Sequence, residues 1–361
     1  MFRSIISRLP PGLKAVLRNG RATVQLTVVR ICSRNGFLSS AYYLLFSRQF
    51  YSEHRAVLRG RLKYWEDLQG GGTSSPLLRR NTHRLEKGLI MKPRRPVFAE
   101  DFILETVQAF NRARETPNYS AEELRWAGDV LGEYFSVVSD TAIIENAREV
   151  FAGTGDINSG PHDAGQAHSK PYLRSDSPTL SVSFEDLQKL FRRRRSVRWF
   201  LQESVPIELI YKAIDAAAQA PSACNRQPFR YIVVTKPEWV SQIADCPGGA
   251  AGFSQQLPAI IVVVGDLSAY PFERDRHLIY IDASLANMQL MLAAETLGLA
   301  TCPINWPDMK IAEDRIGKLI KLPAHERVVM LMGIGYGDPD SGVPYSQKKQ
   351  RDLLVTEFPP K

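Results

Sequence analysis

The sequence predicts an α/β or α+β sandwich over residues 183–361, preceded by a helical region over residues 53–151. Two observations give this prediction. In the C-terminal half, short apolar β-branched runs alternate with amphipathic helical patterns. In the N-terminal half, apolar residues recur at helical spacing. Residues 152–182 between the two halves are predicted to be a linker, because Gly, Ser, Asn and Pro cluster there without apolar periodicity.

Two helices are predicted in the N-terminal half, over residues 99–114 and 121–137, where apolar side chains recur every three or four residues. The segment before them is short and charged, and it contains His83 and Glu86 three residues apart. This spacing places both side chains on one helix face. A surface ion pair is the favoured interpretation over a metal or catalytic pair, because no third ligand lies nearby in the sequence.

The C-terminal half is predicted to contain helices over residues 184–193, 206–220 and 281–297. Pro206 suits a first helical turn, and Gly298 is a natural stop after the third helix. Strands are predicted over residues 231–235, 259–264 and 328–332. The glycines of Gly333–Gly337 follow the last strand, but no helical run opens after them. They are therefore not a dinucleotide fingerprint.

The basic charge is confined to the N-terminus. The chain has a formal charge of +8, and residues 1–52 hold eight Arg or Lys and no acid, which leaves 38 basic and 38 acidic residues in the remainder. This location argues against a nucleic-acid partner for the sandwich. The basic arm is open to three interpretations: a mitochondrial presequence, a peripheral membrane-surface anchor, or an extension that packs on its own domain or on a partner.

The spacing of the cysteines and the hydropathy of the chain bear on its cellular compartment. Cys32, Cys224, Cys246 and Cys302 are far apart and form no C-x-x-C pair, so neither a disulfide scaffold nor a structural zinc site is predicted. This pattern suits a reducing compartment, and we expect a cytoplasmic protein, with membrane association through the arm as an option. No run reaches the 18–20 apolar residues of a membrane span.

Two segments carry the chemistry. Arg192–Arg198 contains four consecutive arginines followed by Ser, Val and Arg, and Ala220–Pro228 is a loop rich in neutral hydrogen-bonding groups. Each alone has an ordinary explanation, a solvated basic face and a helix exit. Together, in this order and joined by one helix, they match a flavin mononucleotide, which needs charge and a hydroxyl for its phosphate and amide and carbonyl groups for its ring edge.

These segments resemble the FMN-dependent nitroreductase family over roughly residues 185–358. The motifs that carry the resemblance are Arg194–Arg198, Val205–Pro206, Ala220–Pro228, Leu297–Pro303 and Gly333–Pro339 with the later Lys349–Arg351. The resemblance implies an α+β three-layer sandwich with a central, mainly antiparallel sheet. It further implies a homodimer with FMN at the subunit interface and hydride transfer from NAD(P)H to a nitro, quinone, enone or similar small acceptor. The segment Arg80–Leu89 resembles nitroreductase-like proteins linked to surface polysaccharide synthesis.

The resemblance assigns the cofactor contacts. The arginine segment would contact the phosphate and the pyrimidine edge of the flavin, and the C-terminal segment would also reach the phosphate. The loop of the partner subunit would contact the ring. Residues 303–305 would lie beside the reactive edge of the ring. No side chain is assigned a catalytic or metal-binding role, and Cys302 is not favoured as a nucleophile because it has no evident His partner. The expected cofactor-binding residues are Arg194, Arg195, Ser196, Arg198, Pro221, Ser222, Asn225, Gln227, Pro303, Ile304, Asn305, Lys349 and Arg351.

Three departures from the family pattern concern substrate choice and flavin tuning. Phe229 stands where Trp is common, Asn305 stands where many members have Glu or Gly, and Asp245–Gly252 lacks the Asn and Lys that some members use. A second function therefore stays open: a flavin-binding or degenerate member that acts as an accessory protein through its helical region. NAD(P)H-dependent reduction of bound flavin distinguishes the two.

Overall fold

The computed structural model describes residues 10, 23–47, 49–68, 72–153 and 169–358. The chain divides into two compact units, Met1–His54 and Arg55–Lys361. Part of the basic arm, residues 1–9 and 11–22, lies outside the described residues. In the first unit, residues 23–32 are helical and are followed by α3 (Gly36–Tyr42) and the π-helix η1 (Tyr43–Ser47). Neither α3 nor η1 contains a buried residue.

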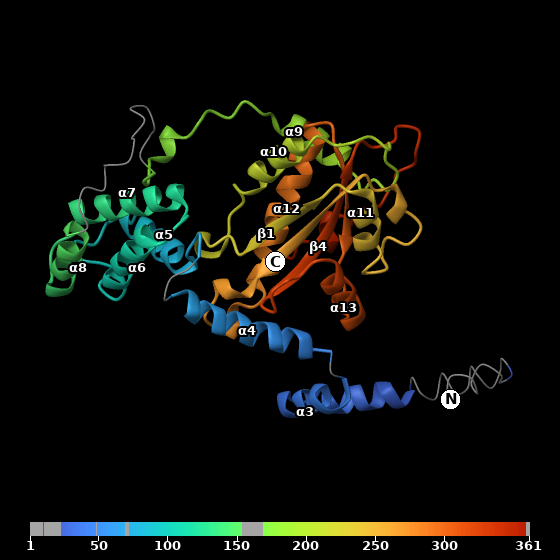
Figure 1. The fold of residues 1–361 in the computed structure, drawn as a ribbon, viewed down its shortest axis with the longest axis horizontal. Helices are drawn as coiled ribbons and strands as arrows, with labels where there is room; N and C mark the ends of the chain where they lie inside the picture. The colour runs from blue at the N-terminus through green and yellow to red at the C-terminus, as the bar shows by residue number, and fades with distance from the viewer. Residues whose placement is uncertain (1–9, 11–22, 48, 69–71, 154–168, 359–361) are drawn as a thin grey trace. The chain divides into compact units, whose positions relative to one another are not determined.

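The second unit contains a sheet of four antiparallel strands (Figure 1). The strands are β1 (Phe229–Val234), β2 (Ala259–Asp266), β3 (Ala300–Asn305) and β4 (Glu326–Gly335), in the order β1-β2-β4-β3. Alternate side chains of a strand point to opposite faces, and β2 shows this directly. Its Ile260 and Val262 join one apolar cluster, and its Ala259 and Ile261 join another.

Helices cover both faces of the sheet, so the fold is an α+β three-layer sandwich, as expected. On one face lie α10 (Ile207–Ala217) and α12 (Leu278–Thr296), and on the other lie α11 (Pro237–Ala244) and α13 (Lys310–Leu319) (Figure 1). The helix α9 (Phe184–Arg193) precedes them, and the short 3-10 turns η3 (Ala223–Asn225) and η7 (Arg351–Leu353) lie in loops.

Several elements of the sandwich differ from the prediction, and the helices α11 and α13 were not predicted. Strand β3 was not predicted, because Pro303 disfavours a strand assignment; β3 is an edge strand, where proline is tolerated. Strand β4 extends beyond the predicted residues 328–332 and includes Gly333 and Gly335. These glycines were interpreted as the strand's end, but they permit close packing: a Cβ at Gly335 would lie 2.3 Å from the Pro258 side chain. Helix α12 begins at Leu278, three residues before the predicted start.

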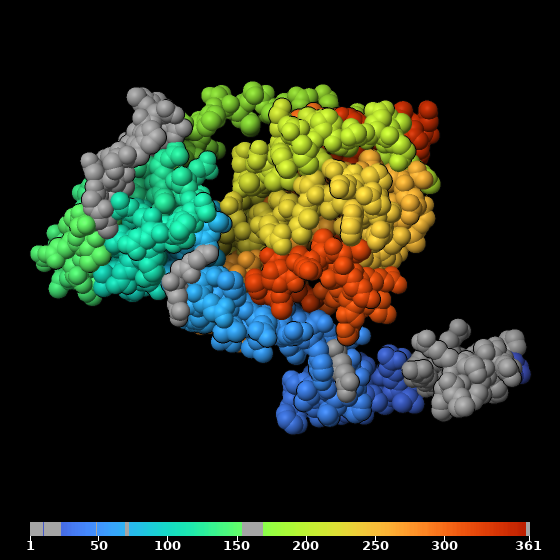
Figure 2. All heavy atoms as spheres, in the orientation of Figure 1, coloured from blue at the N-terminus to red at the C-terminus, as the bar shows by residue number. Residues whose placement is uncertain are grey.

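The N-terminal part of the second unit is helical, as predicted. It consists of α4 (Tyr51–Asp67), α5 (Pro76–Leu89), α6 (Ile103–Glu115), α7 (Ala121–Val137) and α8 (Ala142–Ala152). Figure 2 shows the atoms of residues 72–153 gathered in a compact body, and this body has an apolar core of its own. Helix α6 starts at Ile103 rather than Ala99, because Ala99 has a left-handed φ of 66° and cannot continue a right-handed helix.

Helix α4 packs on the sandwich instead of on the helical core. Its Ala56 and Val57 form a cluster with Leu267 and Ile279. Gly60 makes this contact close, because a Cβ at this position would lie 2.6 Å from the Leu267 Cβ. Glycine is thus required here for close helix packing.

Candidate functional site

The arginine segment lies along the edge strand β3. Helix α9 is capped by Ser183, whose hydroxyl accepts a hydrogen bond from the Asp186 amide, and it ends at Arg194. The chain then forms a parallel bridge between Ser196 and Thr301, and the Val197 amide donates to the Thr301 carbonyl at 3.0 Å. The bridge fixes the backbone that carries the predicted phosphate ligands.

Two buried polar atoms at this bridge lack a protein partner. Arg194 Nε and Thr301 Oγ1 form no hydrogen bond in the described part of the chain. Buried polar groups in native proteins are almost always hydrogen-bonded. They are two of eight buried side-chain atoms without a protein partner in the described residues, and the other six lie elsewhere in the chain.

The neighbouring arginines serve different purposes. The Arg193 guanidinium forms an ion pair with Glu295 of α12 at 2.9 Å, which ties α9 to the sandwich. The Arg198 guanidinium lies over the Phe253 ring at 5.8 Å and donates to the Ser196 carbonyl at 3.4 Å. Arg195 is half-buried. In this segment Arg193 therefore has a structural role, whereas Arg195 and Arg198 are held near the start of β3.

Strand β3 leaves one backbone edge available after the bridge. Among the described strands it pairs only with β4, with Asn305 opposite Met330. An edge strand presents unpaired N–H and C=O groups along its outer side. Ile304 is buried, Pro303 is half-buried and Asn305 is exposed, so the end of this strand combines apolar packing with accessible polar groups.

Cys302 lies in the same strand but has no features of a nucleophile. Its side chain is buried, and burial raises the pKa of the thiol, although the charge of Arg198 acts in the opposite direction. A thiol that stays protonated is a poor nucleophile.

The second predicted segment forms a tight loop before β1. Cys224, Asn225 and Gln227 have left-handed backbones with φ of 53°, 52° and 49°. This conformation is uncommon for residues other than glycine. Two hydrogen bonds within the segment support it: the Gln227 amide donates to Ser222 Oγ at 3.0 Å, and the Gln227 side chain donates to the Ala218 carbonyl at 2.8 Å.

A buried acid also holds this loop. Asp282, in the first turns of α12 and 3% exposed, accepts hydrogen bonds from the Ala223 amide at 2.9 Å and from the Tyr270 hydroxyl at 3.2 Å. Burial raises the pKa of this carboxyl, while the two donors and the nearby Arg226 lower it. Arg226 is buried and lies 4.8 Å from the Tyr270 ring.

Sequence analysis did not identify Arg79, which contacts the same loop from the helical region. Its Nε donates to the Asn225 carbonyl at 2.8 Å, and another guanidinium nitrogen donates to Gln227 Oε1 at 3.1 Å. Arg79 immediately precedes the motif Arg80–Leu89. No local pattern distinguishes it, because its partners are 146 and 148 residues away.

The two predicted segments lie at opposite ends of the sheet within one chain. Thr301, beside Ser196, pairs with Ile334, which pairs with Ala259 at the start of β2. The loop leads into Phe229, which pairs with Gly265 near the end of β2. Six residue steps along β2 separate the two positions, about 20 Å at 3.3 Å per residue.

The C-terminal segment does not pack into the sandwich. Lys349 and Arg351 are both exposed, and so is every residue from Gly342 to Phe358. Exposed apolar side chains accompany them on this segment and on two helices: Leu353, Leu354 and Phe358; Phe184, Leu187 and Phe191 of α9; Ile281, Leu285 and Met288 of α12. The predicted apolar side of α9 is therefore present, but in the isolated chain it is not buried.

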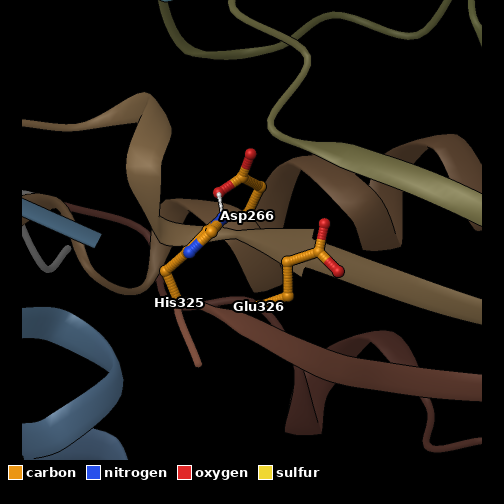
Figure 3. Close-up of side chains that lie close together, drawn as sticks. All are labelled: Asp266, His325 and Glu326. Atoms are coloured by element: carbon orange, nitrogen blue, oxygen red, sulfur yellow. Dashed lines mark ion pairs between the residues drawn. The ribbon is translucent and has the colours of Figure 1, made fainter. Parts of the chain in front are cut away.

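The ionisable cluster Asp266, His325 and Glu326 places three ligand-type atoms within 4.8 Å of one another (Figure 3). Its groups already have protein partners. Both Glu326 oxygens accept hydrogen bonds from Arg230 at 2.9 and 2.6 Å, and Asp266 Oδ1 accepts from the Ser268 amide. His83 and Glu86 likewise contact each other on α5, with 3.2 Å between Nδ1 and Oε2. In both groups the side chains are explained by their contacts with other protein groups.

In the described residues, no helix has the length and apolar character needed to cross a membrane.

Comparison with known proteins shows that residues 191–250 and 241–336 match the Nitroreductase family. A protein of Methanothermobacter thermautotrophicus with the provisional name NADH dehydrogenase/NAD(P)H nitroreductase is 33% identical over 165 residues, covering 45% of this chain and 82% of that protein. Mouse iodotyrosine deiodinase 1 is 24% identical over 215 residues, covering 51% and 73%. Among solved structures, an FMN-dependent nitroreductase of Clostridium difficile aligns with a TM-score of 0.38 at 26% identity, covering 44% of this chain and 91% of that chain.

Proposed function

Because this chain belongs to the nitroreductase family and is an oxidoreductase, we propose that it binds FMN and transfers hydride from NAD(P)H to a small organic acceptor. The acceptor class is a nitro compound, a quinone, an enone or a similar molecule. The observation that carries the proposal is the bridge between Ser196 and Thr301, which holds the segment expected to bind the cofactor phosphate beside β3.

The phosphate of FMN is assigned to the arginine segment. The guanidinium groups of Arg194, Arg195 and Arg198 are planar and carry several N–H donors each, and Ser196 adds a neutral hydroxyl. Lys349 and Arg351 are assigned to the same phosphate from the exposed C-terminal segment. This donor set fits a phosphate, because it places several cations and a hydroxyl along one fixed stretch of backbone beside β3.

The ring of FMN is assigned to two other segments. Pro303, Ile304 and Asn305 offer the outer edge of β3, where a backbone N–H is available to the reactive edge of the ring. The loop residues Pro221, Ser222, Asn225 and Gln227 are assigned to the flavin of a partner protomer. Once FMN is bound it carries the hydride, and the protein orients the ring and shields it from water.

A homodimer follows from this assignment. The two segments lie about 20 Å apart along β2 in one chain, and this separation supports a site completed by the partner's loop. Exposed apolar side chains on α9, α12 and the C-terminal segment supply a surface for the partner. Aromatic, Leu, Ile and Met side chains of this kind are typical of permanent subunit interfaces.

The first experiment measures cofactor and turnover. Purified protein is expected to be yellow and to release FMN on denaturation, and NADH or NADPH is expected to bleach the bound flavin. Acceptors are then compared: nitroaromatics, quinones, enones and, because iodotyrosine deiodinases are among the relatives, an iodinated tyrosine. A protein that takes up no added FMN contradicts the proposal. Flavin that binds but is not reduced supports instead the accessory role through the helical region.

The phosphate assignment is tested by Arg194→Ala combined with Ser196→Ala. Loss of a charge-assisted contact and a hydroxyl contact is expected to weaken FMN binding by on the order of 2–4 kcal/mol. Fluorescence titration of apoprotein measures the affinity, and circular dichroism checks the fold. The matched control is Arg192→Ala, which removes an exposed cation of the same run. Equal FMN affinity of the double variant and this control would refute the assignment.

A further inference from the structure

Arg79 of α5 links the helical region to the predicted flavin loop by hydrogen bonds. Two of its guanidinium nitrogens donate to the loop, one to the Asn225 carbonyl at 2.8 Å and one to Gln227 Oε1 at 3.1 Å. The third donates to Glu123 of α7 at 3.0 Å. Every nitrogen of the planar fork therefore has an acceptor, which gives the side chain a single orientation.

Glu123 anchors the guanidinium group of Arg79. Its side chain is 2% exposed and accepts three further hydrogen bonds, from Ser74 Oγ at 2.6 Å, from the Ser75 amide at 3.0 Å and from the Tyr119 hydroxyl. A buried carboxylate with this many donors does not move independently of the helices that supply them. The guanidinium is thus anchored to α5, to α7 and to the segment between α4 and α5.

An aromatic side chain restrains the guanidinium further. Its central carbon lies 5.4 Å from the Trp126 ring centre, within the range of a cation–π contact. Trp126 is itself held, because its indole N–H donates to Glu86 at 2.9 Å. The arginine is therefore oriented by hydrogen bonds and by an aromatic ring.

The loop needs such support. Cys224, Asn225 and Gln227 all have left-handed backbones without being glycine, and such conformations persist only where the surroundings enforce them. The bond to the Asn225 carbonyl and the bond to the Gln227 side chain act directly on two of these three residues. Both are residues assigned to the flavin.

We propose that Arg79, held by Glu123, is a positioning residue of the flavin site, and that the helical region serves to set the loop Ser222–Gln227 in its binding conformation. This inference rests on the proposed FMN-binding function of the loop. Arg79 acts through the loop and does not contact the cofactor within its own chain. It gives the helical region a function within the oxidoreductase site that requires no external partner.

The test compares Arg79→Gln, Arg79→Lys and Glu123→Gln with the control Arg84→Gln. Arg84 lies on the same helix and pairs with Asp101 and the Phe102 ring, away from the loop. The first readout is hydrogen exchange of amides 222–227 in the FMN-free protein. Exchange is expected to be about tenfold faster in Arg79→Gln and unchanged in Arg84→Gln. Arg79→Lys keeps the charge beside Glu123 but not the two-pronged contact, so an intermediate increase is expected.

The second readout is the affinity for FMN and the visible circular dichroism of the bound flavin. Arg79→Gln is expected to bind FMN about tenfold more weakly and to alter the dichroic bands, which report ring orientation. Loop exchange and FMN binding identical to those of Arg84→Gln would overturn the inference. If instead the FMN proposal is wrong, the wild-type protein binds no FMN. The hydrogen-exchange measurement then still decides whether Arg79 holds the loop in its conformation. If Arg79→Gln does not fold, Arg79→Lys is judged by the same two readouts.

Discussion

At the scale of single residues, buried polar groups organise the loop before β1. Asp282 holds the Ala223 amide, and Arg79 holds the Asn225 carbonyl. Both groups are provided by helices distant in sequence, and both act on backbone atoms, so they fix the path of the chain. An unpaired buried polar group is costly, which makes each of these contacts sensitive to substitution.

Asp282 gives a pH dependence with a definite sign. Its folded pKa is raised by burial above the unfolded value of 3.8, so the folded state binds more protons in the window between the two values. Stability contributed by this carboxyl is therefore full at low pH and declines as pH rises through the folded pKa. The variant Asp282→Asn keeps an acceptor oxygen and removes the titration.

Relative to wild type, Asp282→Asn is expected to gain stability progressively as the pH rises from about 4 through the folded pKa of Asp282, as measured by the denaturant midpoint. The control is Asp338→Asn. The pKa of Asp338 is lowered by its hydrogen bonds from Ser341 and the Asp340 amide, so its titration lies below this window and its difference from wild type should stay flat. A flat difference for Asp282→Asn as well would contradict the prediction.

The cysteines should divide into two classes. Cys246 and Cys302 are buried, and burial raises the pKa of both thiols, whereas Cys32 and Cys224 are half-buried. We expect Cys32 and Cys224 to react with a thiol reagent in the native protein, and Cys246 and Cys302 to react only after denaturation. Mass spectrometry of labelled peptides identifies the sites. Rapid labelling of Cys302 in the native state would show that β3 opens or that the thiol is activated.

At the scale of elements, the helix α9 and the first unit both expose large apolar side chains. Helix α9 exposes Phe184 and Phe191 in the isolated chain, and the first unit exposes Phe37, Leu44 and Phe46. An amphipathic helix gains most of its stability from burial of its apolar face. We therefore propose a partner surface for each segment: a second protomer for α9, and an anionic membrane surface for the arm, whose residues 1–52 carry eight cations and no acid.

Deletion of residues 1–52 tests the interpretation of the arm. Basic side chains near an anionic bilayer contribute about 1 kcal/mol each, so full-length protein should sediment with phosphatidylserine vesicles and the truncated protein should do so less. Flavin binding should be unchanged. Added salt should weaken the association, because charges are screened beyond roughly 8–10 Å. Equal vesicle binding by both proteins would exclude an anchor, and loss of folded protein on truncation would favour an arm that packs on its own chain.

At the scale of the whole molecule, the separation of the two predicted segments is the decisive feature. One end of β2 lies near the arginine segment and the other near the flavin loop. The separation of about 20 Å along β2 supports the proposal that the arginine segment of one chain and the loop of a second copy bind the same FMN.

Mixed dimers test this arrangement. One chain carries Arg194→Ala with Ser196→Ala, and the other carries Asn225→Gly, which removes the side chain but tolerates a left-handed backbone. Each homodimer should bind FMN weakly, whereas a mixed dimer should contain one intact site and bind one FMN with wild-type affinity. Tandem affinity purification followed by titration measures this. Weak binding by the mixed dimer would show that each site lies within one chain.

The local elements and the family were predictable from the sequence, because periodic burial, helix caps and motif chemistry act over a few residues. The helices α6, α7, α9, α10 and α12 and three of the four strands belong to this class. Strand β3 was not predicted, because Pro303 is unusual inside a strand. The proline is tolerated because β3 lies at the edge of the sheet.

Tertiary structure alone decided the rest. The contact of Arg79 with Asn225 joins positions 146 residues apart, and Asp282 reaches Ala223 across 59 residues. The separation of the arginine segment from the loop depends on strand register. Such contacts arise from the packing of complete elements against one another, and no pattern within a short window of sequence encodes which distant side chain will complete a given turn.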